Sequence, residues 1–347
     1  MKKINEIKDF IIQIIEKHPK DVTRLTAERF GLNRRTIVDH LQSLITAGLL
    51  TAEGRTKARV YKLRTVIEES WTLPITPDSE EHQVWQTTVA PHLTDVPDNV
   101  RAICQHGFNE MFNNAIDHSN SPDARVDLKT TAASIKIRIS DNGIGIFEKI
   151  RTALNLADPR EALLELSKGK LTTAPERHAG EGIFFTSRMF EKFSILSGEL
   201  VYLAQASKDD DWLFEFADGK PIAGTAVDMN ISTRSTRTTQ SVFDRFSGVD
   251  DGFTKTHVPV ALARYGEDRL VSRSQARRVL ARFEKFKEVS LDFSGVATIG
   301  QPFADEIFRV FAEQNPNIKI THSHASDQIK SMVAWVRGSR GIQGPLL

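Results

Sequence analysis

Cysteine is almost absent from this sequence. Cys104 is the one cysteine among 347 residues, so a disulfide within the chain is excluded and the composition fits a reducing compartment. We interpret Cys104 as a small residue of a hydrophobic core rather than as a reactive thiol.

Long hydrophobic runs are also missing. No segment approaches the roughly 20 consecutive apolar residues that a membrane-spanning helix requires. The chain begins with two lysines, as some signal peptides do, but Glu6 and Asp9 interrupt the apolar core that such a peptide needs. The sequence shows neither an internal repeat nor a low-complexity tract. We therefore expect a cytoplasmic protein with no membrane partner.

The net charge is close to zero, at +1, but it is unevenly distributed. Residues 1–65 contain fourteen Lys and Arg against seven Asp and Glu, a net charge of +7, which leaves −6 for the remainder. A basic head on an acidic body predicts an anionic partner for the head. The length of 347 residues predicts two or three domains.

The basic head has the pattern of helices followed by a hairpin. Isoleucines at helical spacing over residues 4–15 predict a first helix, and Asp21 and Asn33 are placed to cap a second and a third. Two short apolar segments, 49–53 and 58–63, then flank a turn and predict a β-hairpin.

Three helices followed by a basic hairpin resemble a winged helix-turn-helix, which we assign to residues 1–65. In such a domain the third helix enters the major groove of DNA, and basic side chains of the wing contact phosphates. The resemblance implies DNA contacts by Arg34, Arg35, Thr36 and His40 of the third helix and by Arg55, Lys57 and Arg59 of the hairpin. The same fold also serves protein docking or dimerisation, and the basic excess favours DNA.

The stretch 108–120 carries a dense set of polar side chains among apolar ones. Read as a helix, it places Glu110, Asn114 and His118 four residues apart on one face, with Asp117 beside them. Apolar residues can occupy most of the remaining circumference. Polar groups aligned on a largely buried helix are costly unless a ligand uses them, so we expect this face to line a binding site.

Three glycine-containing motifs follow in order along the chain. Asp141–Gly145 follows an alternating strand, Gly180 and Gly182 precede an apolar helix, and Gly224-Thr225 leads into another strand. The four motifs in this order resemble the Bergerat-fold (GHKL) domains, which include gyrase-like and chaperone ATPases, histidine kinases and anti-sigma serine kinases.

This resemblance implies an architecture for the middle of the chain. We expect a Bergerat α/β sandwich with a mixed sheet over residues 79–232. Residues 66–78 contain two prolines and predict a linker or an edge strand. Residues 233–252 are rich in Ser, Thr and Arg and predict a second linker.

The resemblance also implies roles for individual residues. Asn114 would coordinate Mg²⁺ between the phosphates of ATP, because this ion prefers hard oxygen ligands. Glu110 would act as a general base toward a water or a hydroxyl, an effect worth on the order of 10²–10⁴ in rate. Asp141 would accept a hydrogen bond from adenine. The other implied nucleotide-binding residues are Asp117, His118, Gly143, Gly145, Gly180, Gly182 and Thr225. For His118 a structural role is an equal alternative.

Residues 168–179 are predicted to form a mostly polar lid that becomes ordered when nucleotide binds. Lys168, Lys170 or Arg177 could supply a cation to the phosphates, and the sequence does not choose among them. The backbone N–H groups of Gly180 and Gly182, at the start of the following helix, would also face the phosphates.

Residues 253–347 alternate strands and helices, which predicts a third, small α/β domain. Ser272 and Gln275 predict a helix-capping box. The run 291–311 resembles STAS-like domains related to anti-sigma antagonists. Those antagonists carry a phosphorylated serine in an Asp-Ser-Ser-Gly motif, whereas residues 300–303 here read Gly-Gln-Pro-Phe. The resemblance therefore implies a docking or dimerisation domain without the usual acceptor.

Taken together, the sequence predicts a multidomain α/β protein that couples binding or hydrolysis of ATP with Mg²⁺ to binding of DNA or of a partner protein. DNA is expected at the winged helix and a protein partner at the STAS-like domain, and the chain could form a homodimer. The main alternative is a serine/threonine kinase of the anti-sigma type. A histidine kinase is a further alternative, with His82 as the placed candidate for the acceptor.

Overall fold

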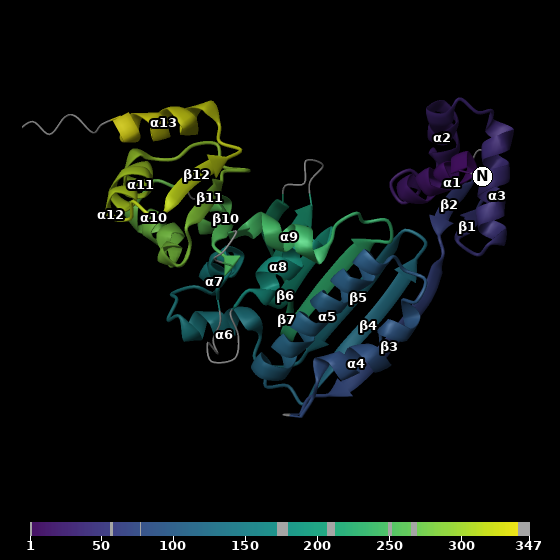
Figure 1. Cartoon of the computed structure of the whole chain (residues 1–347), viewed down its shortest axis with the longest axis horizontal. Helices are drawn as coiled ribbons and strands as arrows, with labels where there is room; N and C mark the ends of the chain where they lie inside the picture. Colours follow the sequence, from purple (N-terminus) through teal and green to yellow (C-terminus); the bar gives the residue numbers. More distant parts are fainter. Residues whose placement is uncertain are drawn as a thin grey trace, which may run out of the picture.

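The computed structural model describes residues 2–55, 58–76, 78–171, 180–206, 212–248, 252–264 and 269–338. These residues form an N-terminal unit (2–63), a central unit (65–246) and a C-terminal unit (252–338). Figure 1 shows the N-terminal and C-terminal units at opposite ends of the central unit. Each terminal unit therefore meets a different part of the central one.

The N-terminal unit consists of α1 (Lys2–Ile14), α2 (Val22–Phe30), α3 (Arg34–Thr46) and the antiparallel pair β1 (Leu50–Glu53) and β2 (Val60–Leu63). Asn33 caps α3 as predicted, because its side chain accepts a hydrogen bond from the backbone N–H of Thr36 at 2.9 Å. Asp21 is the N-cap residue of α2, as predicted, but its side chain makes no cap hydrogen bond. The isoleucines of α1 pack with those of α3 into a hydrophobic core of their own.

The central unit is built on a five-stranded sheet with the order β3-β4-β5-β7-β6. The strands are β3 (Thr65–Pro74), β4 (Asp123–Thr131), β5 (Ser134–Asp141), β6 (Lys192–Ala206) and β7 (Trp212–Ser232). Every neighbouring pair is antiparallel, so the predicted mixed sheet is wrong. The helical connection does leave β5 and β6 parallel to each other, but β7 folds back between them. Strand β3 forms an edge, which was one of the two alternatives for residues 66–78.

Helices cover one face of this sheet, and α5 runs across it in Figure 1. The helices of this unit are α4 (Glu81–Thr87), η2 (Ala90–His92), α5 (Asp98–His118), α6 (Ile146–Ala153), α7 (Pro159–Lys168), α8 (Gly182–Met189) and α9 (Thr239–Phe246). Of these, α5, α6 and α8 pack directly on the sheet. Alternate residues of β4 and β5 are buried beneath the helices. The opposite face is polar and carries the ion pairs Lys129–Glu68 and Arg138–Asp228, as is common for antiparallel sheets. Cys104 is fully buried in α5, as predicted.

Helix α9 lies where a linker was predicted. Its serines and threonines suggested a flexible segment, but Thr238 and Ser241 form a capping box at its start. Phe243 and Phe246 then pack on the phenylalanines of α8, with centroids of Phe243 and Phe185 4.4 Å apart. The polar residues of this segment therefore begin a helix, and its phenylalanines bind it to the core.

The C-terminal unit has a parallel three-stranded sheet in the order β10-β11-β12. Its elements are β10 (Lys255–Pro259), η3 (Val260–Ala263), α10 (Arg273–Leu280), η4 (Phe283–Lys285), β11 (Glu288–Asp292), α11 (Gln301–Asp305), η5 (Glu306–Phe311), α12 (Ala312–Gln314), β12 (Lys319–Ser323) and α13 (Asp327–Gly338). The short pair β8 (Ser247–Gly248) and β9 (Gly252–Phe253) leads into it. The predicted capping box of Ser272 and Gln275 is confirmed. This unit shares one continuous hydrophobic core with the central unit.

Candidate functional site

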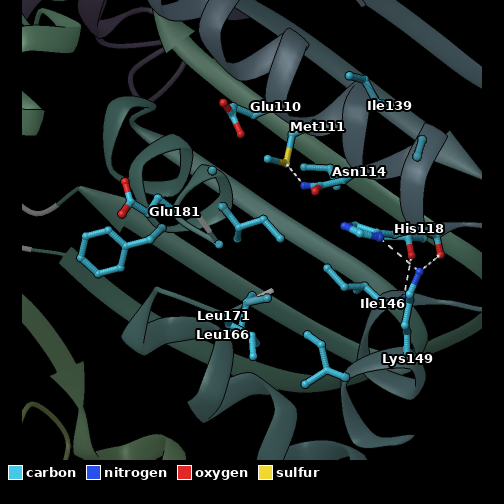
Figure 2. Close-up of a pocket in the computed structure, with 18 of the residues that line it drawn as sticks. Glu110, Met111, Asn114, His118, Ile139, Ile146, Lys149, Leu166, Leu171 and Glu181 are labelled. Atoms are coloured by element: carbon cyan, nitrogen blue, oxygen red, sulfur yellow. Dashed lines mark hydrogen bonds between the residues drawn. The ribbon is translucent and has the colours of Figure 1, made fainter. Parts of the chain in front are cut away.

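A cavity of about 370 Å³ lies between helices α5, α6 and α8 and the sheet. Glu110, Asn114 and His118 of α5 all line it, as their helical spacing predicted. Figure 2 shows these side chains in sequence along one side of the cavity. Asp117 is not among the lining residues, although its charge acts on Lys149 nearby. Three of the four polar residues predicted on α5 therefore face a common space.

Asp141, at the end of β5, is held by two backbone groups. Its Oδ1 accepts hydrogen bonds from the N–H of Gly143 at 2.8 Å and from the N–H of Thr225 at 3.3 Å. Burial raises the pKa of the Asp141 carboxyl, and these two N–H groups oppose that shift. The hydroxyl of Thr225 accepts from the N–H of Ile146 at 3.0 Å. These hydrogen bonds of Asp141 and Thr225 connect the end of β5 with strand β7 and with the first turn of α6.

The resemblance implies that Gly143 binds the nucleotide, but its lack of a side chain serves a different contact. A Cβ there would lie 1.9 Å from the carbonyl oxygen of Ser119, and Gly143 does not line the cavity. The N–H of Ile144 donates to the same carbonyl at 2.9 Å. Gly143 thus allows the loop after β5 to pack against the end of α5, whereas Gly145 does line the cavity, as predicted.

At the other end of the α5 face, Glu110 lies against the first turn of α8. A Cβ on Gly182 would be 2.0 Å from Oε2 of Glu110. A carboxylate at the amino end of a helix is stabilised by the exposed N–H groups and the helix dipole. Gly180, Glu181 and Gly182 line the cavity here, which agrees with the predicted position of the two glycines.

Lys149 was missed at the sequence level. Its Nζ donates to the carbonyl oxygen of His118 at 3.0 Å and lies 3.2 Å from Nδ1 of the same residue. Burial lowers the pKa of Lys149, and the charge of Asp117 opposes this shift. The available signal was the spacing of Ile146, Lys149 and Ile150, which puts all three on one face of a helix that was not predicted.

Two of the three cations predicted for the phosphates, Lys168 and Lys170, have their partners elsewhere. Lys168 ends α7 with a side chain that is 0% exposed and is paired with Glu165 at 2.6 Å, so its assignment to a polar lid is wrong. Lys170 donates to the carbonyl oxygen of Lys285 at 2.9 Å, which directs it toward the C-terminal unit. Arg177 and the rest of the predicted lid, 172–179, lie outside the described residues.

The residues predicted to contact DNA lie on two elements of the N-terminal unit. Arg34 and Arg35 are exposed at the start of α3, and Arg55 is exposed in the turn after β1. Thr36 and His40, also on α3, are partly buried, and the Thr36 hydroxyl donates to the Asn33 side chain at 3.1 Å. The guanidinium of Arg59 lies 5.3 Å from the ring centroid of Tyr61. Lys57 lies outside the described residues.

Comparison with known protein families identifies one region of the chain. Residues 275–330 match the family described as STAS-like domain of unknown function (DUF4325). This confirms the STAS-like prediction for the part of the C-terminal unit that begins in α10 and ends in α13. No curated protein matches the chain.

The part of the chain that the structure describes contains no helix long and apolar enough to cross a membrane. It also contains no group of three His, Cys, Asp or Glu side chains placed to hold a metal ion.

Proposed function

We propose that this chain is an ATP-binding regulator whose central unit is a Bergerat-fold domain. The observation that carries the proposal is the common cavity that joins four separate stretches of sequence. Asn114 of α5, Asp141 and Thr225 of the sheet, and Gly182 of α8 all line it. Its volume of about 370 Å³ lies within the range of small-molecule sites.

The two ends of the cavity differ in a way that suits a nucleotide. At the His118 end of α5 lie Ile146, Thr225 and the acid Asp141, which can accept a hydrogen bond from the amino group of adenine. At the Glu110 end the helix α8 begins, and the first N–H groups of a helix suit phosphates because they have no partner within the helix. Glu110 and His118 are separated by roughly 12 Å along the helix, at about 1.5 Å per residue. This length accommodates a base at one end and phosphates at the other.

Asn114 lies between these ends and fits the expected role toward Mg²⁺. Its side-chain nitrogen is engaged with Sδ of Met111 at 3.9 Å, which leaves the amide oxygen as the atom for a metal ion. Mg²⁺ typically takes one or two protein ligands and completes its shell with phosphate oxygens and water. When bound, the ion would neutralise phosphate charge.

A second candidate is phosphoryl transfer to a partner, as in a serine/threonine kinase. Glu110 favours it, because its carboxylate lies at the start of α8 where we place the phosphates. There it could accept the proton of a water or of a hydroxyl that attacks the terminal phosphate. In this position the Glu110 carboxylate also stabilises the start of α8, so its location alone does not establish catalysis. The fate of the phosphate decides between catalysis and nucleotide gating.

We further propose that the N-terminal unit is a winged helix-turn-helix that binds DNA. Three observations support this: α3 exposes Arg34 and Arg35 at its first turn, a hairpin follows, and residues 1–65 carry an excess of basic side chains. A protein partner is proposed for the STAS-like domain. ATP binding would then change the affinity for DNA or partner, and a coupling of about 1–3 kcal/mol corresponds to roughly 5–150-fold.

Equilibrium binding of labelled ATP to the full chain tests the nucleotide site. We expect Mg²⁺-dependent binding that is lost in Asn114→Ala, because the amide oxygen is removed. The matched control is Asn113→Ala, since Asn113 is the neighbouring asparagine of α5 and does not line the cavity. Equal binding by the two variants would refute the assignment of Asn114.

The fate of the phosphate separates the candidates. The chain is incubated with γ-labelled ATP and Mg²⁺, alone and with cell extract. Free phosphate without labelled protein indicates an ATPase, and acid-stable label on a protein, lost in Glu110→Ala, indicates a serine/threonine kinase. Acid-labile label would instead point to a histidine acceptor. If ATP binds but is not consumed, the chain is a nucleotide-gated switch.

A further inference from the structure

The end of α7 is joined to the C-terminal unit by a buried charge cluster, which consists of Glu165, Lys168 and Arg282. Their side chains are 7%, 0% and 14% exposed, respectively. The ammonium of Lys168 donates to Oε1 of Glu165 at 2.6 Å and to the carbonyl oxygens of Arg278 at 2.9 Å and Ala281 at 3.0 Å. An ammonium has three N–H donors, so this arrangement uses all of them.

The two carbonyl groups belong to the end of another helix. Arg278 lies in the last turn of α10, and Ala281 is its C-terminal cap residue. The last carbonyls of a helix lack partners within it and carry partial negative charge, so a cation there is favourable. A lysine of the central unit therefore caps a helix of the C-terminal unit.

Side chains of the C-terminal unit also donate hydrogen bonds to the central unit. Arg282, which has a left-handed φ of 67°, donates Nη1 to Oε2 of Glu165 at 2.9 Å and Nη2 to the carbonyl oxygen of Gly169. The hydroxyl of Thr256 in β10 donates to the carbonyl oxygen of Lys168 at 2.7 Å. Moving the units apart would leave several of these buried groups without partners, which is strongly unfavourable.

This junction borders the cavity on one side. Three residues after Lys168, the N–H of Leu171 donates to the carbonyl oxygen of Gly180 at 3.0 Å, and both residues line the cavity. Leu166, two residues before Lys168, lines it as well. The position of Gly180, at the end of the cavity proposed for the phosphates, therefore depends on the position of the end of α7.

A second junction holds the far end of α8. Arg188 is fully buried, and its Nη2 donates to the carbonyl oxygen of His257 in β10 at 3.3 Å. Phe184, which lines the cavity, packs on Phe253 with 4.5 Å between ring centroids. The C-terminal unit therefore contacts the chain both before Gly180 and after Gly182.

We propose that the STAS-like C-terminal unit sets the geometry of the nucleotide site, with Lys168 as the positioning residue. This deepens the proposed function and rests on it. A ligand of the C-terminal unit that moves the end of α10 changes ATP affinity, and ATP changes the affinity for that ligand by the same factor. A buried ionic cluster suits this task because its bonds are satisfied in one docked arrangement only.

The test uses the full chain with Lys168→Met, which keeps the length of the side chain and removes its charge. Arg277→Met is the matched control, since Arg277 lies on α10, the helix that Lys168 caps, but is exposed and pairs with Glu306 within the C-terminal unit. We measure the Kd for ATP with Mg²⁺ and the hydrogen exchange of the α8 amides. Lys168→Met should raise the Kd about tenfold and speed α8 exchange, and Arg277→Met should do neither.

A pH profile separates positioning from a general loss of stability. Burial lowers the pKa of Lys168 to about 8 against the opposing charges of Glu165 and Glu284, and Arg282 adds to the lowering. The Kd of the unsubstituted chain should therefore rise between pH 7 and pH 9 toward that of Lys168→Met, whose own Kd stays flat. An equally steep rise in the variant overturns the proposal.

Failure of this inference and failure of the proposed function give different results. If the unsubstituted chain binds no ATP, the proposed function fails, and α8 exchange alone then decides whether Lys168 positions the segment. If ATP binds but Lys168→Met leaves its Kd unchanged, the inference is overturned, whatever the exchange shows. Should Lys168→Met not fold, Glu165→Gln replaces it, because it removes the cluster's anion and keeps the volume.

Discussion

The two terminal units are attached to the central unit in different ways. The N-terminal unit has a separate hydrophobic core, against which Ala132 and Ala133 of the central unit pack. Its ion pair to the central unit, Arg234–Asp9, has side chains that are 29% and 52% exposed. The C-terminal unit shares its core with the central unit and adds the buried charge cluster. The N-terminal unit is therefore a separate module, whereas the C-terminal unit is packed as part of the central fold.

This difference decides how a signal can pass between the units. Exposed ion pairs contribute about 0–1 kcal/mol and are screened by salt, whereas breaking a buried pair costs about 3–5 kcal/mol. Helices α7 and α8 border both the cavity and the C-terminal unit. The N-terminal unit instead continues through Arg64 into the edge strand β3. Coupling of ATP to the C-terminal unit should therefore be stronger than coupling to DNA.

Deletion of each terminal unit should show the largest effect. Removal of residues 252–347 exposes the apolar surfaces of α7, α8 and α9 and leaves Lys168 without its carbonyl partners. We expect loss of cooperative thermal unfolding, measured by circular dichroism and calorimetry. Removal of residues 1–63 should leave a cooperative transition within a few degrees of the original, since 1 kcal/mol shifts the Tm of a protein of this size class by roughly 2–4 °C. Equal damage by both deletions would contradict the comparison.

Single substitutions sharpen the same contrast. Lys168→Met should lower the free energy of unfolding by on the order of 3–5 kcal/mol, because it leaves buried charge and carbonyls without their partner. Arg234→Ala should lower it by less than about 1 kcal/mol, because both side chains of its ion pair with Asp9 are partly accessible to solvent. Urea unfolding of the two variants measures both values, and similar losses would break the distinction.

The smallest expected effect lies within the central unit and concerns pH. Burial raises the pKa of Asp141, so its carboxylate should be lost at a higher pH than usual for an aspartate. ATP affinity should then fall on acidification, because the proposed acceptor for adenine is protonated. The folding stability of the nucleotide-free chain should change with pH in the opposite direction. A raised carboxyl pKa means that the folded state disfavours the charged form, so protonation of Asp141 on acidification adds stability.

Asp141→Asn provides the control for this titration. Phosphate groups also titrate in this range, with a second pKa of about 6 in phosphorylated side chains. The phosphates of ATP contribute equally to the pH profiles of both proteins. Calorimetric titrations between pH 8 and pH 5.5 should therefore show a steeper loss of affinity for the unsubstituted chain. Parallel pH profiles would remove Asp141 from the adenine site.

Local patterns in the sequence were sufficient for some of the site. The spacing of Glu110, Asn114 and His118 specifies one helix face, and a helix is a local structure. The box of Ser272 and Gln275 likewise depends on neighbouring residues. These features could be predicted because the atoms that define them are close in the sequence.

Contacts between distant residues could not be predicted in this way. Lys168 ends α7 and precedes a segment predicted to be mostly polar, so an exposed side chain was expected. Its acceptors Arg278 and Ala281 are more than a hundred positions away in the sequence. Lys149 was missed because α6 was not recognised as a helix. The all-antiparallel sheet depends on the return of β7 between β5 and β6. Strand pairing of this kind is set by the tertiary structure rather than by local pattern.

Hydrogen exchange of the full chain with and without ATP and Mg²⁺ tests the central claim most directly. The account predicts protection around Asn114 in α5, after Asp141 in the loop to α6, and at the start of α8. Protection should extend through Lys168 to the end of α10 and should be weaker in the N-terminal unit. Unchanged exchange at α5 and α8 under saturating ATP and Mg²⁺ would contradict the assignment of this cavity to a nucleotide.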